Sequence, residues 1–204
     1  MSATVYLEGA AQGPDSKDQQ VRCREGFRKL LEKCGYERRL PRLVACGSRN
    51  AAFHDFKIAH GKSTTEDFVA LWIDSEDPLA DLEQTWKHLE QRGDWPRPSG
   101  SMDKQILLMT TCMETWIVAD HAVLEAHYAK NFQKSALPPL TNLEQRQRHE
   151  IQKALIHATR NCSNAYSKGD RSFLILAKLN PETLKAHLPS FARIVRILDQ
   201  QLAP

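Results

Sequence analysis

The chain has 204 residues, of which 41% are hydrophobic and 26% are charged, and its net charge is +3. This length and composition predict a folded globular chain with a sizeable core, and they exclude a disordered or collagen-like protein. The longest clear apolar run covers residues 68–73, whereas a membrane helix needs about 18 apolar residues. The first residues show no secretion signal, so we expect a cytoplasmic protein that does not contact a membrane.

The five cysteines are odd in number and include no C-x-x-C pair. This pattern argues against a disulfide framework and against a zinc ribbon. We therefore expect reduced thiols, most of them buried.

Charge is distributed unevenly along the chain. Residues 61–94 contain nine acids and three bases, a net charge of −6, so the remaining residues carry a net charge of +9. An acidic centre between basic segments fits a metal-dependent enzyme that acts on phosphates. Solvated helix faces would give the same pattern, and charge alone does not separate the two interpretations.

The first half of the chain alternates between strand-like and helix-like segments. Residues 4–7, 42–46 and 68–73 read as strands, and the last of these is apolar throughout, as expected for a strand buried on both faces. Apolar residues recur at helical spacing over residues 23–34 and 52–59.

The alternation continues in the second half. Asp77-Pro78 predicts a helix start, residues 105–109 a fourth strand, and Thr111 with Glu114 a capping box that opens a long helix. Two further helices are expected near residues 144–160 and 181–202. The order βαβαβαβα predicts an α/β fold with a mainly parallel four-stranded sheet, flanking helices and a helical C-terminal extension.

Acidic residues follow three of the predicted strands. They are Glu8, the run Asp74, Glu76 and Asp77, and Glu114. In an open parallel sheet the carboxyl ends of the strands share one edge, where ligands bind. Carboxylates that converge there repel one another unless a cation neutralises them, and such oxygen ligands suit Mg²⁺ or Mn²⁺.

Some of these acids have alternative roles. Asp77 could cap the helix after it, and Glu114 could serve only as the capping-box partner of Thr111. Asp120 lies on the apolar stripe of its helix, so it is either paired internally or faces the site. Asp74 is harder to explain structurally, because it ends a very apolar strand where an unpaired charge is costly.

Basic residues that could contact phosphate occur at two positions. Arg49 lies in a strand-to-helix turn, where a helix N-terminus could hold an anion, although Ser48 could simply cap that helix. Lys168 and Arg171 lie in a basic loop. The sequence contains no H-E-x-x-H, G-x-S-x-G, Walker A or G-x-G-x-x-G motif, so the enzyme classes that these motifs identify lack support.

Several short segments resemble a bacterial family of domains of unknown function. These are the segments around Glu8, Arg49, Asp74 and Glu114, together with Lys168-Gly169 and Ser172-Phe173. That family is similar to the Toprim domains of the RloB-like and OLD-like (overcoming lysogenization defect) nucleases. Toprim domains have a glutamate after the first strand and an Asp-x-Asp pair after the third, and they act on nucleic acid with a divalent metal.

The resemblance implies a role for each matching residue. Glu8 would be the Toprim glutamate, a metal ligand or general acid/base, and Asp74 the first aspartate of the pair. Glu76 stands where the second aspartate is expected, and Asp77 could compensate for its longer side chain. Glu114 resembles the glutamate of a Phe-Glu-x-Trp segment in the RloB-like group.

The sequence thus predicts a Toprim-like α/β domain over residues 1–130 and a helical extension over residues 131–204 packed on the same core. The expected function is a nuclease that uses Mg²⁺ or Mn²⁺. The expected catalytic residues are Glu8, Asp74, Glu76 and Glu114. The expected metal ligands are Glu8, Asp74, Glu76 and Asp77. The resemblance implies phage defence and an AAA or ABC-type ATPase encoded nearby. One alternative is a non-catalytic partner or sensor subunit of that ATPase, and another is a small-molecule phosphohydrolase.

Overall fold

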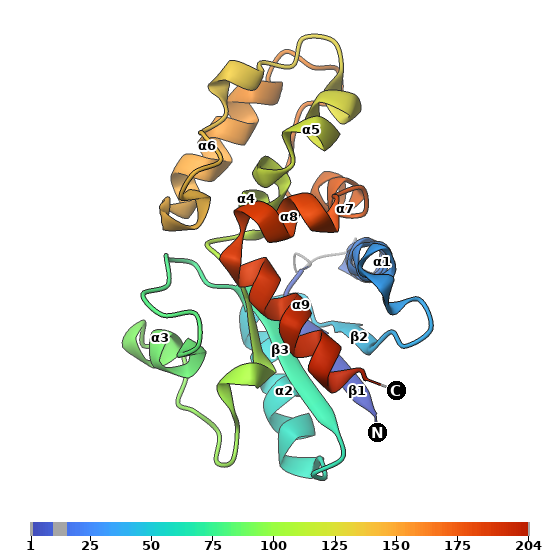
Figure 1. Ribbon diagram of the computed structural model, residues 1–204, viewed down its shortest axis with the longest axis vertical. Helices are drawn as coiled ribbons and strands as arrows, with labels where there is room; N and C mark the ends of the chain where they lie inside the picture. The colour runs from blue at the N-terminus through green and yellow to red at the C-terminus, as the bar shows by residue number, and fades with distance from the viewer. Residues whose placement is uncertain (1, 10–15, 204) are drawn as a thin grey trace.

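Four strands form one parallel sheet (Figure 1). They are β1 (Ala3–Leu7), β2 (Arg42–Ala45), β3 (Phe68–Asp74) and β4 (Ile106–Met109), and their order across the sheet is β2-β1-β3-β4. All three strand pairings are parallel. The computed structural model describes residues 2–9 and 16–203, and within them the expected α/β fold with a four-stranded parallel sheet is confirmed.

Strand β3 shows why the sheet is covered on both faces. All seven of its residues are buried. Phe68, Ala70 and Trp72 face one hydrophobic core, while the intervening residues face a second core. A strand with no solvent face needs apolar residues at every position, which explains the continuous apolar run in the sequence.

Helices cover both faces. On one face lie α2 (Arg49–Lys62) and α3 (Thr85–Gln91), and on the other lie α1 (Ser16–Leu31) and α9 (Pro189–Gln201). The remaining helices are α4 (Met113–Ala119), α5 (His121–Tyr128), α6 (Arg148–Thr159), α7 (Asp170–Leu176) and α8 (Pro181–His187), with short helical turns at Glu32–Tyr36, Asp103–Gln105, Lys134–Ala136 and Leu143–Gln145. None of the helices in the described residues is long and apolar enough to cross a membrane.

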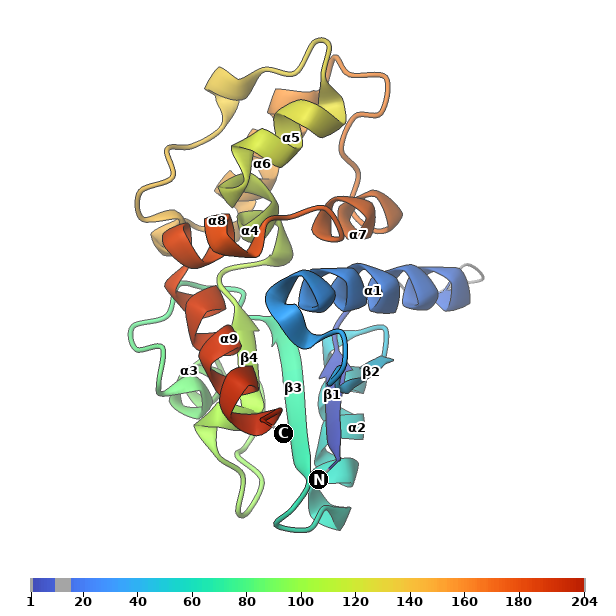
Figure 2. The ribbon, with the colours of Figure 1, turned by 45° about the vertical axis from the view of Figure 1, so that its right-hand side comes forward.

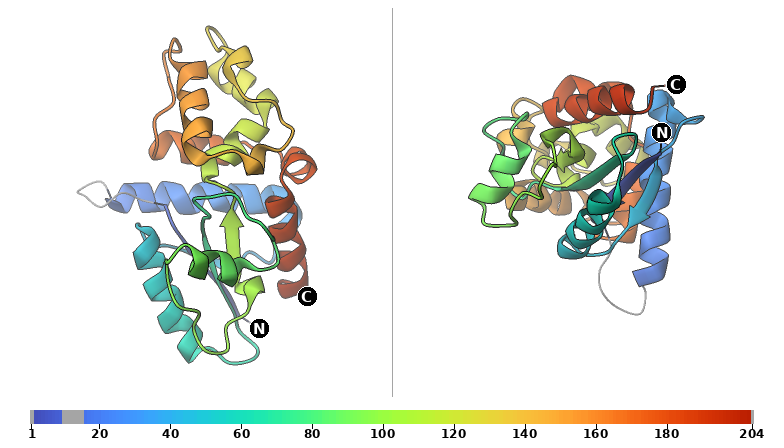
Figure 3. Two further views of the ribbon diagram at one scale, coloured as in Figure 1. Left: turned by 90° about the vertical axis from the view of Figure 1, so that its left-hand side faces the viewer. Right: turned by 90° about the horizontal axis from the view of Figure 1, so that it is seen from below.

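The helices α4 to α8 lie beyond the carboxyl ends of the strands (Figure 2). Helix α7 packs against α1, and α9 then runs back along the sheet beside β4. Consequently β1 begins and α9 ends at the far end of the molecule (Figure 3). The first core contains side chains from both the sheet region and the later helices, while the division near residue 130 stays a prediction.

Two expected long helices are each broken in two. The helix expected after Thr111 is interrupted at Asp120, which caps α5 by accepting a hydrogen bond from the N–H of Val123 (3.1 Å). Its other carboxylate oxygen accepts from the N–H of Asn180 (2.9 Å), just before α8. Asp120 is therefore paired internally. The helix expected over residues 181–202 breaks before Pro189, because proline has no N–H to continue the bonding of α8.

Three predicted helix starts are wrong. No helix begins at Asp77, since the next helix, α3, begins at Thr85. Thr111 is not the N-cap of α4, a position that Cys112 occupies without a side-chain cap bond. The helix expected from residue 144 begins as α6 only at Arg148. In contrast, Ser48 caps α2 as the sequence suggested, by accepting from the N–H of Ala51.

The connections that follow the two central strands, β1 and β3, run toward opposite edges of the sheet. From β1 the chain passes through α1 to β2, on one side of β1, whereas from β3 it continues to β4 on the other side. Such a reversal leaves a crevice outside the carboxyl ends of the two central strands, which is where ligands bind in open α/β sheets. The fold therefore directs attention to the ends of β1 and β3.

Candidate metal centre

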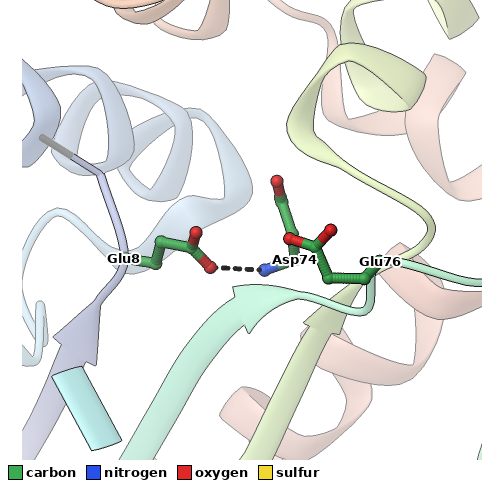
Figure 4. Close-up of side chains that lie close together, drawn as sticks. All are labelled: Glu8, Asp74 and Glu76. Carbon is green, nitrogen blue, oxygen red and sulfur yellow. Dashed lines mark hydrogen bonds between the residues drawn. The ribbon is translucent and has the colours of Figure 1, made fainter. Parts of the chain in front are cut away.

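Three carboxylates converge at this crevice (Figure 4). Glu8 follows β1, Asp74 ends β3, and Glu76 lies in the loop after β3. One ligand oxygen from each residue lies within 4.8 Å of the others. Adjacent pairing of β1 and β3 brings together residues that are 66 positions apart in the chain.

Backbone groups fix two of these side chains. The N–H of Asp74 donates to Glu8 Oε2 at 3.3 Å, and the N–H of Met113 donates to Asp74 Oδ1 at 2.9 Å. Asp74 continues the face of β3 that carries Trp72, so its side chain turns toward α4. The pairing of strands and the start of α4 therefore determine the geometry of the pair.

The site concentrates negative charge in a poorly solvated place. Asp74 is only 5% exposed, and burial together with the charges of Glu8 and Glu114 raises its pKa well above the ordinary value. Burial also raises the pKa of Glu8, while the hydrogen bond from Asp74 and the charges of Arg49 and Lys168 oppose that change. A bound cation would relieve this repulsion.

The loop that carries Glu76 is held on both sides. Glu76 forms an ion pair with Arg148 at the start of α6. Its backbone has a φ of +70°, a conformation that is costly without glycine, and its N–H donates to the carbonyl of Thr111 at 2.9 Å. His88 of α3 also bonds to the carbonyl of Ser75 at 3.0 Å. These contacts direct the Glu76 carboxylate toward Asp74.

A fourth carboxylate, Glu114, lies nearby and is fully buried. Its Oε1 accepts a hydrogen bond from the hydroxyl of Tyr166 at 2.8 Å. Its Oε2 is buried and has no hydrogen-bond partner among the described residues. Tyr166 was missed as a site residue in the sequence, where nothing indicates that its ring folds back onto α4.

A cavity of about 470 Å³ opens beside these groups. Three of the predicted acids and two of the predicted bases line it, along with glycines, small polar residues and apolar side chains. The lining residues are Glu8, Gly9, Gln19, Gly47, Ser48, Arg49, Asp74, Met109, Met113, Glu114, Lys168, Gly169, Ser172 and Phe173.

The other predicted site residues do not line the cavity. Asp77 is outside the converging group, and its side chain is 49% exposed and paired with Arg92. Arg171 is not among the residues that line the cavity, and its guanidinium donates to the carbonyl of Ala165. Glu76 belongs to the carboxylate group but not to the cavity wall.

Glycine allows the loop after β1 to lie close to its neighbours. The N–H of Gly9 donates to the carbonyl of Gly47 at 3.0 Å, which joins the loops after β1 and β2. Gly9 has a φ of +155°, and a Cβ there would lie 2.6 Å from Cys23 Sγ. A larger residue would therefore displace the loop that positions Glu8.

Comparison with known families identifies the chain as a member of a domain family of unknown function. Residues 17–199 match the model of the family described as "Domain of unknown function (DUF4276)", so the chain belongs to that family. The match begins after Glu8 and includes Asp74, Glu76 and Glu114. No curated protein and no solved structure shows significant similarity to the chain.

Proposed function

We propose that the chain is a divalent-metal-dependent nuclease that hydrolyses phosphodiester bonds in DNA or RNA. The observation that carries the proposal is the convergence of Glu8, Asp74 and Glu76, with ligand oxygens within 4.8 Å of one another, at the carboxyl edge of a parallel sheet. The positions of these acids after the first and third strands agree with the resemblance to Toprim domains.

The chemistry of the residues fits Mg²⁺ or Mn²⁺. Both ions prefer hard oxygen ligands, and all three converging side chains supply carboxylate oxygens. Glu114 also lines the adjoining cavity and adds negative charge beside Asp74 that a bound cation would offset. When bound, the ion would supply the Lewis acid that activates water and stabilises negative charge on the phosphate.

The residues of the site would hold the cation, orient the substrate phosphate and accept a proton. Glu8, Asp74 and Glu76 would hold the cation, and Arg148 keeps Glu76 in position through its ion pair. Arg49 and Lys168 line the same cavity as Glu8 and Asp74, and their positive charges would orient the substrate phosphate. Glu114, kept in place by Tyr166, would accept a proton at the inner end of the cavity.

The biological setting is part of the same proposal. The resemblance alone supports phage defence or a mobile element, with an AAA or ABC-type ATPase as partner, while the cysteine pattern supports a reducing cytoplasm. Copurification of the chain with the product of a neighbouring ATPase gene would test that partner. If purified chain and partner together cleave nothing, the alternative of a non-catalytic subunit gains support.

The nuclease proposal is tested by incubating purified protein with DNA, bulk RNA and tRNA in Mg²⁺ or Mn²⁺. Wild-type protein should cleave at least one substrate, EDTA should abolish the cleavage, and Asp74→Asn should reduce it at least 100-fold. Asp199→Asn is the matched control, because Asp199 lies at the opposite end of the sheet, near its amino edge, and should retain full activity. Equal cleavage by Asp74→Asn would refute the site assignment.

A further inference from the structure

The cavity beside the carboxylates is lined by residues of three chemical kinds, which we call its acidic, basic and apolar walls. The acidic residues are Glu8, Asp74 and Glu114, the basic ones are Arg49 and Lys168, and the apolar ones are Met109, Met113 and Phe173. Its volume of about 470 Å³ falls in the range of pockets that take one small organic ligand, about 300–1,000 Å³. The following inference rests on the proposed function and concerns which part of a nucleic acid this cavity admits.

Two buried polar atoms on the cavity-lining residues lack a partner among the described residues. One is the acceptor Oε2 of Glu114, and the other is the donor Nε of Arg49. An unsatisfied buried polar group is costly, but both atoms are themselves covered by protein. A ligand in the cavity would therefore meet the exposed Lys168 and the other lining residues rather than these two atoms.

Of the two basic residues, Arg49 is held in a fixed position, whereas Lys168 is exposed. Both terminal nitrogens of Arg49 bond to Asp94, at 2.8 and 3.0 Å, and its guanidinium lies 4.5 Å from the centre of the Trp95 ring. These contacts leave Nε as the donor of Arg49 that has no bond. Gly47 and Ser48 at the N-terminus of α2 line the same cavity, where the positive end of a 14-residue helix favours an anion.

The apolar wall consists of Met109, Met113 and Phe173. Each is at most 7% exposed, and each lines the cavity. Methionine and phenylalanine form favourable contacts with flat aromatic groups, including nucleobases. Inorganic phosphate would leave this wall unused.

We propose that the cavity binds a single nucleotide unit, with the phosphate against Arg49 and Lys168 and the base or sugar against the Met109–Met113–Phe173 wall. The substrate is then a free nucleotide, a single strand or a frayed end. An intact duplex is excluded because Asp74 and Glu114 are 5% and 0% exposed, and a nucleotide must leave the base stack to reach groups buried in this way.

Binding to the full chain tests the proposal without requiring turnover. Calorimetry with thymidine 5′-monophosphate in Mg²⁺ should give one site per chain, bound at least tenfold more tightly than inorganic phosphate or thymidine alone. Undetectable binding of the nucleotide at millimolar concentration, or binding equal to that of phosphate, would overturn the proposal.

Two variants test the basic and the apolar residues of the cavity separately. Lys168→Gln should weaken nucleotide binding at least fivefold, whereas Lys153→Gln, an equal loss of charge on the exposed face of α6, should leave it unchanged. Phe173→Leu should weaken binding of the nucleotide but not that of phosphate. Equal effects of the two lysine substitutions would contradict the assignment of Lys168 to the cavity.

Cleavage assays then identify the source of the nucleotide. A single-stranded oligonucleotide should be cut at least tenfold faster than its blunt duplex in Mn²⁺, and equal rates would overturn the exclusion of duplexes. If neither is cut but the free nucleotide binds and depends on Lys168, the nucleotide site stands while the nuclease proposal fails. If both are cut equally and the free nucleotide does not bind, the nuclease proposal stands and the nucleotide site fails.

Discussion

The two ends of the sheet carry cavities that differ in size and in chemistry. The cavity at the amino end is larger, about 830 Å³ against about 470 Å³ at the carboxyl end. It is lined by Glu37, Arg38 and Arg39, which are exposed, and by Ala3, Gly35, Leu40, Gln201, Leu202 and Ala203. Arg39 there bonds to the carbonyl of Leu202 and lies over Tyr36.

The carboxyl-end cavity is smaller, yet two of its acids, Asp74 and Glu114, are buried, and Glu114 is incompletely satisfied. Asp74 is almost inaccessible, its pKa is raised by burial and by neighbouring acids, and Glu114 retains an unpartnered oxygen. Exposed charges at the amino end are solvated and cost little. Buried and incompletely satisfied charge, rather than volume, is therefore the reason for proposing the carboxyl-end cavity as the functional site.

The largest expected difference in activity is between a substitution at the carboxyl end of the sheet and the same kind of substitution at its amino end. Glu8→Gln should reduce metal-dependent cleavage at least 100-fold, which corresponds to about 2.7 kcal/mol of transition-state stabilisation, because it removes a ligand charge. Glu37→Gln at the amino end should change kcat/KM less than twofold. Comparable losses in the two variants would remove the distinction between the cavities.

A buried acid outside both cavities sharpens the comparison. Glu144 is 6% exposed and accepts hydrogen bonds from the N–H and hydroxyl of Ser190, yet burial raises its pKa from 4.5 to about 7. Between these two values the unfolded chain releases the proton while the folded chain retains it. Stability should therefore fall as the pH rises from about 4.5 to 7.

Glu144→Gln should remove this dependence, because glutamine imitates the protonated acid and keeps an acceptor for Ser190. Urea unfolding should show the variant to be about 3 kcal/mol more stable than the wild type at pH 8, with little difference at pH 4. Cleavage activity should not change. A variant that is less stable than the wild type at pH 8 would mean that Glu144 is ionised and favourably bound in the fold.

A smaller effect is expected from the buried acid beside the metal ligands. Glu114→Gln should lower kcat/KM about tenfold, or 1.4 kcal/mol, because it removes a proton acceptor but keeps the bond from Tyr166. The exposed Glu150→Gln on α6 is the control and should retain full activity. Unchanged activity in Glu114→Gln would limit Glu114 to a structural role.

The fold could be predicted from the sequence where local patterns dominate. The apolar run of β3, the strand-like segments before and after it, and the Ser48 cap all correspond to elements of the structure. The helix boundaries that failed depend on contacts that a local pattern does not contain. Asp120, for example, which caps α5 where the longer helix was expected to continue, also accepts a hydrogen bond from the N–H of Asn180, 60 residues away.

The site was predictable as a set of acids at strand ends, since parallel strands must bring these positions to one edge. Their roles were less predictable. Asp77 is adjacent to Glu76 in sequence but lies outside the converging group and pairs with Arg92, a contact that the local sequence does not indicate. The contacts of Asp94 and Trp95 with Arg49, and of Tyr166 with Glu114, join distant segments, and no spacing in the sequence indicates them.

Direct titration with Mn²⁺ tests the central claim, that Glu8, Asp74 and Glu76 form a cation site. Calorimetry of the metal-free wild type should show specific binding, and Asp74→Asn should lose it while Asp199→Asn retains it. No binding to the wild type at millimolar Mn²⁺, or equal binding to Asp74→Asn, would contradict the account.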